Sequence, residues 1–238
     1  MDNPVKNSLR STPNSIPTTK ELNAYIAKVY NWMAFALFTT GLISYLTANS
    51  QFLTDLIFSS NLVFYALLIG ELLLVGYLVS VIDNLSAKNA MVIFIGYAAL
   101  NGLTISFIFL IYTTASIATT FYITGGTFGI MSLFGYYTKK DLTTIGNMAY
   151  MGLVGIILAS IFNWFFQNEL IYWIVTYLGI LIFVGLVAYD TQKIRKIGMQ
   201  GFSSKEDMEK SSIIGALHLY LDFINLFLLL LRIFGNRK

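Results

Sequence analysis

Four charged side chains lie within or beside long apolar segments and are the residues best placed to do chemistry. Glu71, Asp222 and Arg232 lie inside such segments, and Asp190 follows the predicted end of another. An ionisable group is costly to hold inside a membrane, so each of these residues is a candidate for function. Arg232 is close enough to its segment end to extend its charge to the interface, which favours a structural role.

The segment that contains Asp222 carries a polar stripe. Its members are three or four positions apart, which places them within an arc of roughly 100° on a helix. The stripe consists of Gly215, His218, Asp222, Asn225, Leu229 and Arg232. Such a stripe must avoid lipid, so this helix belongs in the interior of a bundle. We favour a functional role for Asp222 and hydrogen-bonded structural roles for His218 and Asn225. His218 and Asn225 are also candidates for lining an ion path, and Glu71 could either line that path or be protonated and hydrogen-bonded to a neighbouring Ser, Thr or Asn.

Asp190 and Asp222 are predicted to form a pair. Two buried carboxylates in contact cannot both ionise cheaply, so they would share one proton near neutral pH. Such a pair is a proton-sensitive latch, and its deprotonation would separate the helices and leave oxygen ligands that suit Ca²⁺. Counting helical rise places Asp222 about 14 Å below the inner surface and Asp190 near that surface. Contact therefore requires one of the two helices to be shifted by about two turns.

The composition identifies the environment of these groups. Of the 238 residues, 56% are apolar or aromatic and 11% are charged, against about 25% charged in soluble domains. Residues 89–138 contain no Lys, Arg, Asp or Glu. This excludes a soluble enzyme, a secreted factor and a nucleic-acid-binding module as first interpretations. The absence of cysteine excludes disulfides, thiolate nucleophiles and cysteine-ligated metals.

The sequence predicts an all-α integral membrane protein with seven transmembrane helices. A span needs about 20 apolar residues, and seven segments meet that length. They are residues 29–48, 62–82, 91–112, 116–137, 147–167, 170–188 and 213–234. None of them contains proline, so no proline kink is expected. Residues 1–28 are polar and are predicted to be a largely disordered cytoplasmic tail, followed by a membrane domain over residues 29–238.

Basic residues predict the orientation. The N-terminal tail and the loops after spans two, four and six together contain twelve Lys and Arg residues, whereas the alternate loops contain none. Because basic loops stay inside, the N-terminus is expected in the cytoplasm. Seven crossings leave Arg232, Arg237 and Lys238 outside. A re-entrant last segment would place them inside, but this segment is long enough to span.

Several motifs resemble the Bax inhibitor-1 (transmembrane Bax inhibitor motif) family. The most specific are the Tyr-Asp-Thr-Gln block and the Leu-Tyr-Leu-Asp-Phe-Ile-Asn-Leu-Phe block. The full set is Asn101-Gly102, Gly126–Phe128, Tyr137–Leu142, Ile161–Asn163, Ala188–Gln192, Leu219–Phe227 and Leu231–Gly235. The resemblance extends from span one to the end of the chain and favours a bacterial member in the inner (plasma) membrane.

This resemblance implies a seven-helix bundle with the last helix at its centre. It also implies a pH-sensitive calcium leak gated by an aspartate dyad, here Asp190 and Asp222, with Glu71 matching an acidic position in the second span. Some relatives carry an arginine near the inner end of that span, whereas Val81–Asn84 offers no base. Eukaryotic members are linked to suppression of cell death and bacterial ones to a membrane-anchored protease.

Three other functions are compatible with parts of the pattern. The protein could be a non-conducting regulator that binds another membrane protein, such as a membrane-anchored protease or a cell-death factor. Cation/proton exchange through the same dyad would differ from a leak only in coupling. An intramembrane aspartyl protease is the least favoured, because Leu219–Leu221 replaces the Gly-x-Gly expected before the second aspartate and the spans contain no proline. The sequence thus predicts no enzyme and no cofactor, with the bilayer, protons and transported Ca²⁺ as partners.

Overall fold

A computed structural model describes residues 17–238. The regular secondary structure in this range is helical, apart from one isolated antiparallel bridge between Tyr112 and Arg237. The helices are α1 (Thr19–Ala48), α2 (Gln51–Phe58), α3 (Asn61–Val81), α4 (Ala87–Ile105), α5 (Phe107–Ile111), α6 (Thr114–Tyr137), α7 (Thr143–Phe166), α8 (Glu169–Gln200) and α9 (Lys205–Phe234). Seven helical stretches are long and apolar enough to cross a membrane, which confirms the predicted fold class.

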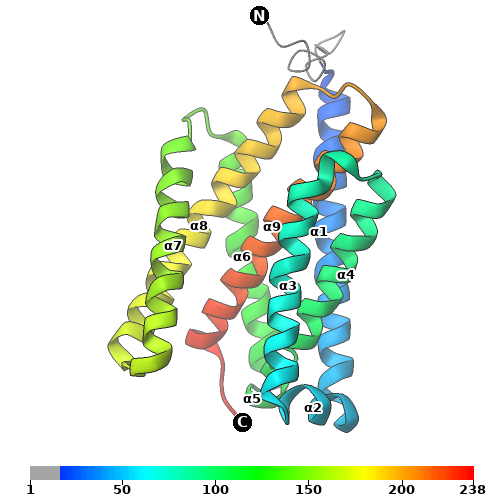
Figure 1. Cartoon of the computed structure of the whole chain (residues 1–238). Coiled ribbons are helices and arrows are strands. Elements are labelled where there is room, and N and C mark those ends of the chain that lie inside the picture. The colour runs from blue at the N-terminus through cyan, green and yellow to red at the C-terminus, as the bar shows by residue number, and fades with distance from the viewer. Residues whose placement is uncertain (1–16) are drawn as a thin grey trace, which may run out of the picture.

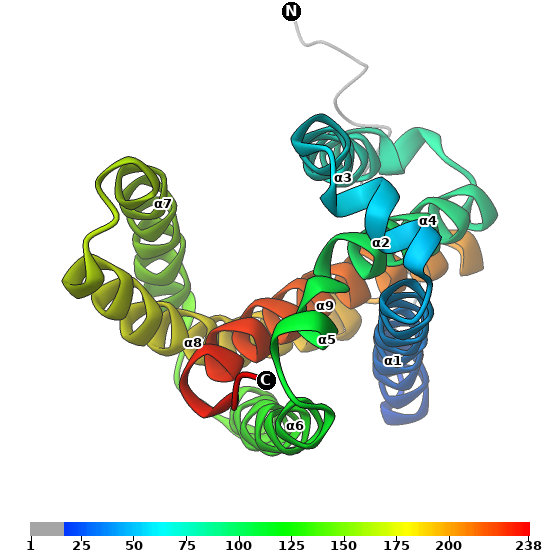
Figure 2. The ribbon, with the colours of Figure 1, turned by 90° about the horizontal axis from the view of Figure 1, so that it is seen from below.

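Helix α9 is the centre of the bundle. Among the seven spans it is the most enclosed, with 72% of its most apolar stretch buried against at most 50% in any other span. It packs against α1, α4, α6 and α8, and Figure 2 shows it crossing the middle of the molecule. This position follows from its sequence, because a polar stripe on a membrane helix is stable only where other helices shield it from lipid.

The helix α1 begins earlier than the predicted span. Thr18 and Glu21 form a capping box, in which the Thr18 hydroxyl accepts from the Glu21 N–H and the Glu21 side chain accepts from the Thr18 N–H. Residues 19–28 are therefore helical and not part of a disordered tail, whereas the prediction for residues 1–16 lies outside the described residues. Lys28, in this extension, forms a 2.9 Å ion pair with Glu209 of α9.

The third span breaks without a proline. The segment predicted as residues 91–112 divides into α4 and α5 at Ser106. The Ser106 hydroxyl donates to the carbonyl oxygen of Leu103 at 2.7 Å. A hydroxyl that bonds to a preceding carbonyl competes with the regular backbone pattern, so this bond accounts for the break at Ser106.

The last helix is long and apolar enough to cross a membrane and does not turn back along its length. Helix α9 runs without interruption over 30 residues, and the start of α1 and the C-terminus lie at opposite ends of the bundle (Figure 1). The loop that joins α8 to α9 lies at the same end as the start of α1. Arg232, Arg237 and Lys238 therefore lie at the end opposite the basic loops, as seven crossings require.

Candidate functional site

The two predicted aspartates meet at the buried interface of α8 and α9. Asp190 and Asp222 are 3% and 4% exposed, and the Asp222 carboxyl group lies within hydrogen-bonding reach of the Asp190 carboxyl group. Asp222 Oδ2 is buried and receives no hydrogen bond from any donor among residues 17–238. A proton shared by the two carboxyl groups would supply a donor for this oxygen, and it stays a prediction from the residue types.

The predicted end of span six was wrong, and the correction explains how the aspartates meet. Helix α8 continues to Gln200, ten residues beyond Asp190, so Asp190 is an interior residue and not a C-terminal one. In the interior of the helix, Asp190 does not meet the negative end of the helix dipole. The polar run after Asp190 led to the prediction of a loop, because the contacts that bury it come from distant parts of the chain.

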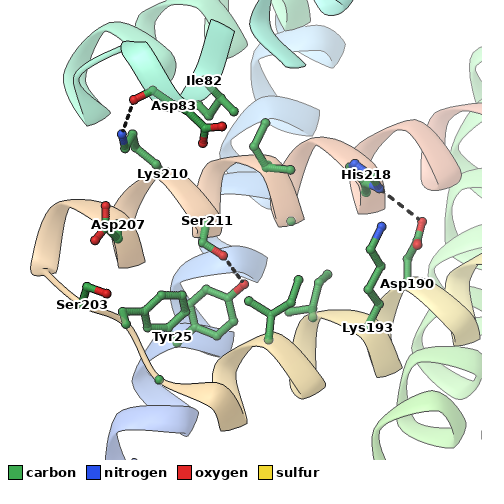
Figure 3. Close-up of a pocket in the computed structure, with 16 residues that line it drawn as sticks. Tyr25, Ile82, Asp83, Asp190, Lys193, Ser203, Asp207, Lys210, Ser211 and His218 are labelled. Carbon is green, nitrogen blue, oxygen red and sulfur yellow. Dashed lines mark hydrogen bonds and ion pairs between the residues drawn. The ribbon is translucent and has the colours of Figure 1, made fainter. Parts of the chain in front are cut away.

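Three further side chains surround Asp190. The Tyr150 hydroxyl, from α7, donates to Asp190 Oδ1 at 3.4 Å, and His218 Nδ1 of α9 lies 3.7 Å from Asp190 Oδ2. Figure 3 shows Lys193 extending from α8 toward the same place. The spacing of Lys193, three residues after Asp190, could have indicated this. No feature of the sequence separates Tyr150 from the other tyrosines.

A cavity of about 580 Å³ leads to this group from the end of the bundle where α8 and α9 are joined. Asp190, Lys193 and His218 line its inner part, and the α8–α9 loop lines its mouth (Figure 3). At the mouth, Lys210 Nζ donates to the carbonyl oxygen of Asp83 at 3.0 Å. Asp222 is not part of the wall, so the cavity gives solvent a route to one carboxyl group of the pair and not to the other.

The residues that follow Asp190 attach α8 to its neighbours. Gln192 Oε1 accepts from the Leu142 N–H at 2.9 Å, and Gln192 Nε2 donates to the Lys140 carbonyl oxygen at 2.8 Å. The Thr191 hydroxyl donates to that of Ser132 at 3.3 Å. The Tyr-Asp-Thr-Gln block thus places its carboxylate by fixing α8 against α6 and the loop after it.

An ion pair between the α6–α7 loop and helix α8 gives a prediction about the pKa of a carboxyl group. Lys196 donates to Asp141 at 2.7 Å, and this contact, with help from Thr143, lowers the pKa of Asp141 to about 2. A lowered pKa means that the pair exists above this pH and is lost as pH falls through it. Replacing Lys196 with Gln should raise the Asp141 pKa toward its ordinary value. Titration of the Asp141 carboxyl by NMR in micelles checks this, with Lys20→Gln as the control that should leave it unchanged.

Glu71 belongs to a different network. Its carboxylate accepts from the Thr104 hydroxyl at 2.6 Å and from Asn101 Nδ2 at 3.2 Å. The Tyr220 hydroxyl of α9 donates to Asn101 Oδ1 at 3.1 Å and lies 2.7 Å from the Thr40 hydroxyl. This chain of bonds connects four helices and does not reach the dyad. The sequence left two arrangements open for Glu71, a hydrogen-bonded one and one that lines an ion path. The structure shows Glu71 hydrogen-bonded.

Of the other predicted residues, His218 joins the site and Asn225 does not. Asn225 Nδ2 donates to the Leu221 carbonyl oxygen of its own helix at 2.8 Å. Arg232 places its guanidinium carbon 5.3 Å from the centre of the Tyr172 ring, a cation–π contact at the far end of α9.

The site is not arranged as a resident metal centre. Across residues 17–238, no group of three or more His, Asp or Glu side chains could hold a metal ion. Ca²⁺ takes six to eight oxygen ligands, so Asp190 and Asp222 could supply only part of a shell.

Comparisons with known proteins agree with the fold. A family model described as "Inhibitor of apoptosis-promoting Bax1" matches residues 22–238. The chain is 50% identical over 218 residues to the inner membrane protein YbhL of Escherichia coli K12, covering 91% of this chain and 93% of that protein. It is 41% identical over 216 residues to an uncharacterized protein of Borreliella burgdorferi, covering 91% and 93% of the two chains.

A third relative, an uncharacterized membrane protein of Streptococcus pyogenes, is 33% identical over 218 residues, covering 90% of this chain and 93% of that protein. With the seven apolar helices, these matches support a multi-pass bacterial inner membrane protein. The chain belongs to the Bax inhibitor family, the one its motifs resemble.

Proposed function

We propose that this protein is a pH-sensitive leak for Ca²⁺ in the bacterial inner membrane, gated by Asp190 and Asp222. The observation that carries the proposal is the buried contact between these two carboxyl groups at the inner end of an open cavity. The proposal involves no enzymatic step and no cofactor, and Ca²⁺ is the transported ion.

The physical basis is the cost of like charges in a poorly solvated place. While one proton is shared, the two carboxyl groups attract each other and hold α8 against α9. Without the proton, two negative charges in contact repel, and the surrounding helices screen them far less than water does. The charge state of the pair therefore biases how these helices pack, and α9 contacts most of the bundle.

The surroundings of Asp190 support a regulated site. Tyr150 comes from α7 and His218 from α9, so both neighbouring helices contact the same carboxylate. A change in the Asp190 charge would thus alter contacts on two sides of α8. The cavity connects this position to the end of the bundle that carries the basic loops, which we propose faces the cytoplasm.

Calcium flux in liposomes tests the proposal. The full-length protein is reconstituted into vesicles that contain a calcium dye, and dye response is measured between about pH 6 and pH 8. A one-proton switch changes a population by up to about tenfold per pH unit, so flux should change several-fold over this range. A matching proton flux would instead favour a cation/proton exchanger. No flux, together with stable capture of another membrane protein, would favour the non-conducting regulator.

A further inference from the structure

The end of the bundle opposite the start of α1 carries basic residues that the orientation rule does not explain. In the described chain, this end has three Lys or Arg residues, and Arg232 is engaged with the Tyr172 ring. Arg237 and Lys238 are exposed. They lie on a short segment after α9 that turns back onto the linker between α5 and α6.

Backbone contacts fix the place of this segment. The Lys238 N–H donates to the Ile111 carbonyl oxygen and the Thr113 N–H donates to that of Asn236, both at 2.9 Å. Lys238 Nζ donates to the carbonyl oxygen of Phe109 at 2.7 Å. The backbone of Arg237 and Lys238 is thus attached beside α5, and the Lys238 side chain is held there as well.

An apolar cavity of about 280 Å³ lies next to these cations, between α1, α5, α6 and α9. Phe109, which accepts the Lys238 hydrogen bond, is part of its wall. On α6 the wall extends from Thr114 to Tyr122, or about 12 Å of helix. The cavity therefore begins at the level of the cations and extends toward the middle of the membrane.

One hydroxyl in the wall has no partner. Ser44 of α1 lines the cavity and is 1% exposed, and its Oγ makes no hydrogen bond with any residue from 17 to 238. Buried hydroxyls are almost always hydrogen-bonded, so one that is not indicates a missing partner. Ser44 lies four residues before the end of α1, about 6 Å in from that end.

We propose that this cavity binds an anionic membrane phospholipid. An acyl chain occupies the apolar space, an ester oxygen accepts a hydrogen bond from Ser44, and Arg237 and Lys238 hold the phosphate headgroup. An apolar cavity of about 150 Å³ holds benzene, so one of 280 Å³ has room for the first part of an acyl chain. Charge complementarity selects an anionic lipid, and the site explains why basic residues occur at this end. The proposal is independent of the calcium leak.

Native mass spectrometry of the full-length protein tests the charge requirement. The protein in detergent is given phosphatidylglycerol or phosphatidylcholine with identical acyl chains, and retained lipid is measured. Two cations near a headgroup should favour the anionic lipid by roughly tenfold. The double variant Arg237→Gln/Lys238→Gln should reduce retention of phosphatidylglycerol to the level of phosphatidylcholine. Equal retention of both lipids by the unmodified protein would overturn the proposal.

A second variant tests the cavity. Gly41 lines it, and a Cβ added there would have no neighbour within 4 Å, so the side chain of Gly41→Leu should extend into the cavity and abolish retention of both lipids. Gly126→Leu is the matched control, because Gly126 of α6 also has no neighbour within 4 Å and lies outside the cavity. The control should bind as the unmodified protein does. Unchanged retention by a folded Gly41→Leu variant would also overturn the proposal.

Discussion

Replacing either Asp190 or Asp222 with asparagine is expected to make calcium flux independent of pH. Asparagine keeps the shape of the side chain and can still hydrogen-bond across the α8–α9 interface, but it cannot gain or lose the shared proton. Each single variant should therefore show less than about a twofold change in flux where the unmodified protein changes several-fold. The measurement is the liposome assay described above.

The double variant makes this test specific to a shared proton. Two groups that titrate as one unit are not additive, so Asp190→Asn/Asp222→Asn should give the same flat profile as each single variant. Asp55→Asn is the control, because Asp55 is an exposed carboxylate on α2, away from the dyad. It should retain the full pH dependence. A flux that still responds to pH in both single variants would remove the dyad from the mechanism.

The sequence predicted those parts of this fold that depend on local composition. Runs of apolar residues located all seven spans, since a helix in lipid must be apolar along its length. The polar stripe on α9 placed that helix inside the bundle. The same reasoning failed after residue 188, where Thr191 and Gln192 are polar and yet buried. Their burial depends on Ser132 and on the loop after α6, at least 50 residues away in the chain, and local patterns do not contain such contacts.

The candidate site, too, could be predicted from the sequence only in part. Asp190 and Asp222 could be paired from their chemistry alone, because a buried carboxylate needs a partner and the next helix offered one. The place of Tyr150 could not be predicted, since it depends on how closely α7 approaches α8. The role of Glu71 stayed open for a similar reason. Its hydrogen bonds come from Asn101 and Thr104, which form a matching pair only once α3 and α4 pack together.

The close approach of α6 and α7 to the part of α8 that carries Asp190 depends on two glycines. A Cβ added at Gly135 of α6 would collide with the Ala188 carbonyl oxygen, and one added at Gly146 of α7 would lie 2.5 Å from the Tyr189 ring. Both contacts are with the two residues that precede Asp190. Glycine at these positions therefore allows α6 and α7 to lie directly against the segment of α8 that carries the dyad.

Gly135→Ala is expected to destabilise the protein strongly. The added methyl group meets backbone, which cannot rotate away, so α6 must move away from α8. Overpacking of this kind costs about 1–3 kcal/mol or more, and unfolding in mixed micelles should show it. Gly129→Ala is the control on the same helix, where a Cβ has no neighbour within 4 Å. Alanine is the better helix former by up to about 1 kcal/mol, so the control should be neutral or slightly stabilising. Equal stability of the two variants would contradict the tight α6–α8 contact, whereas a loss confined to Gly135→Ala would support it.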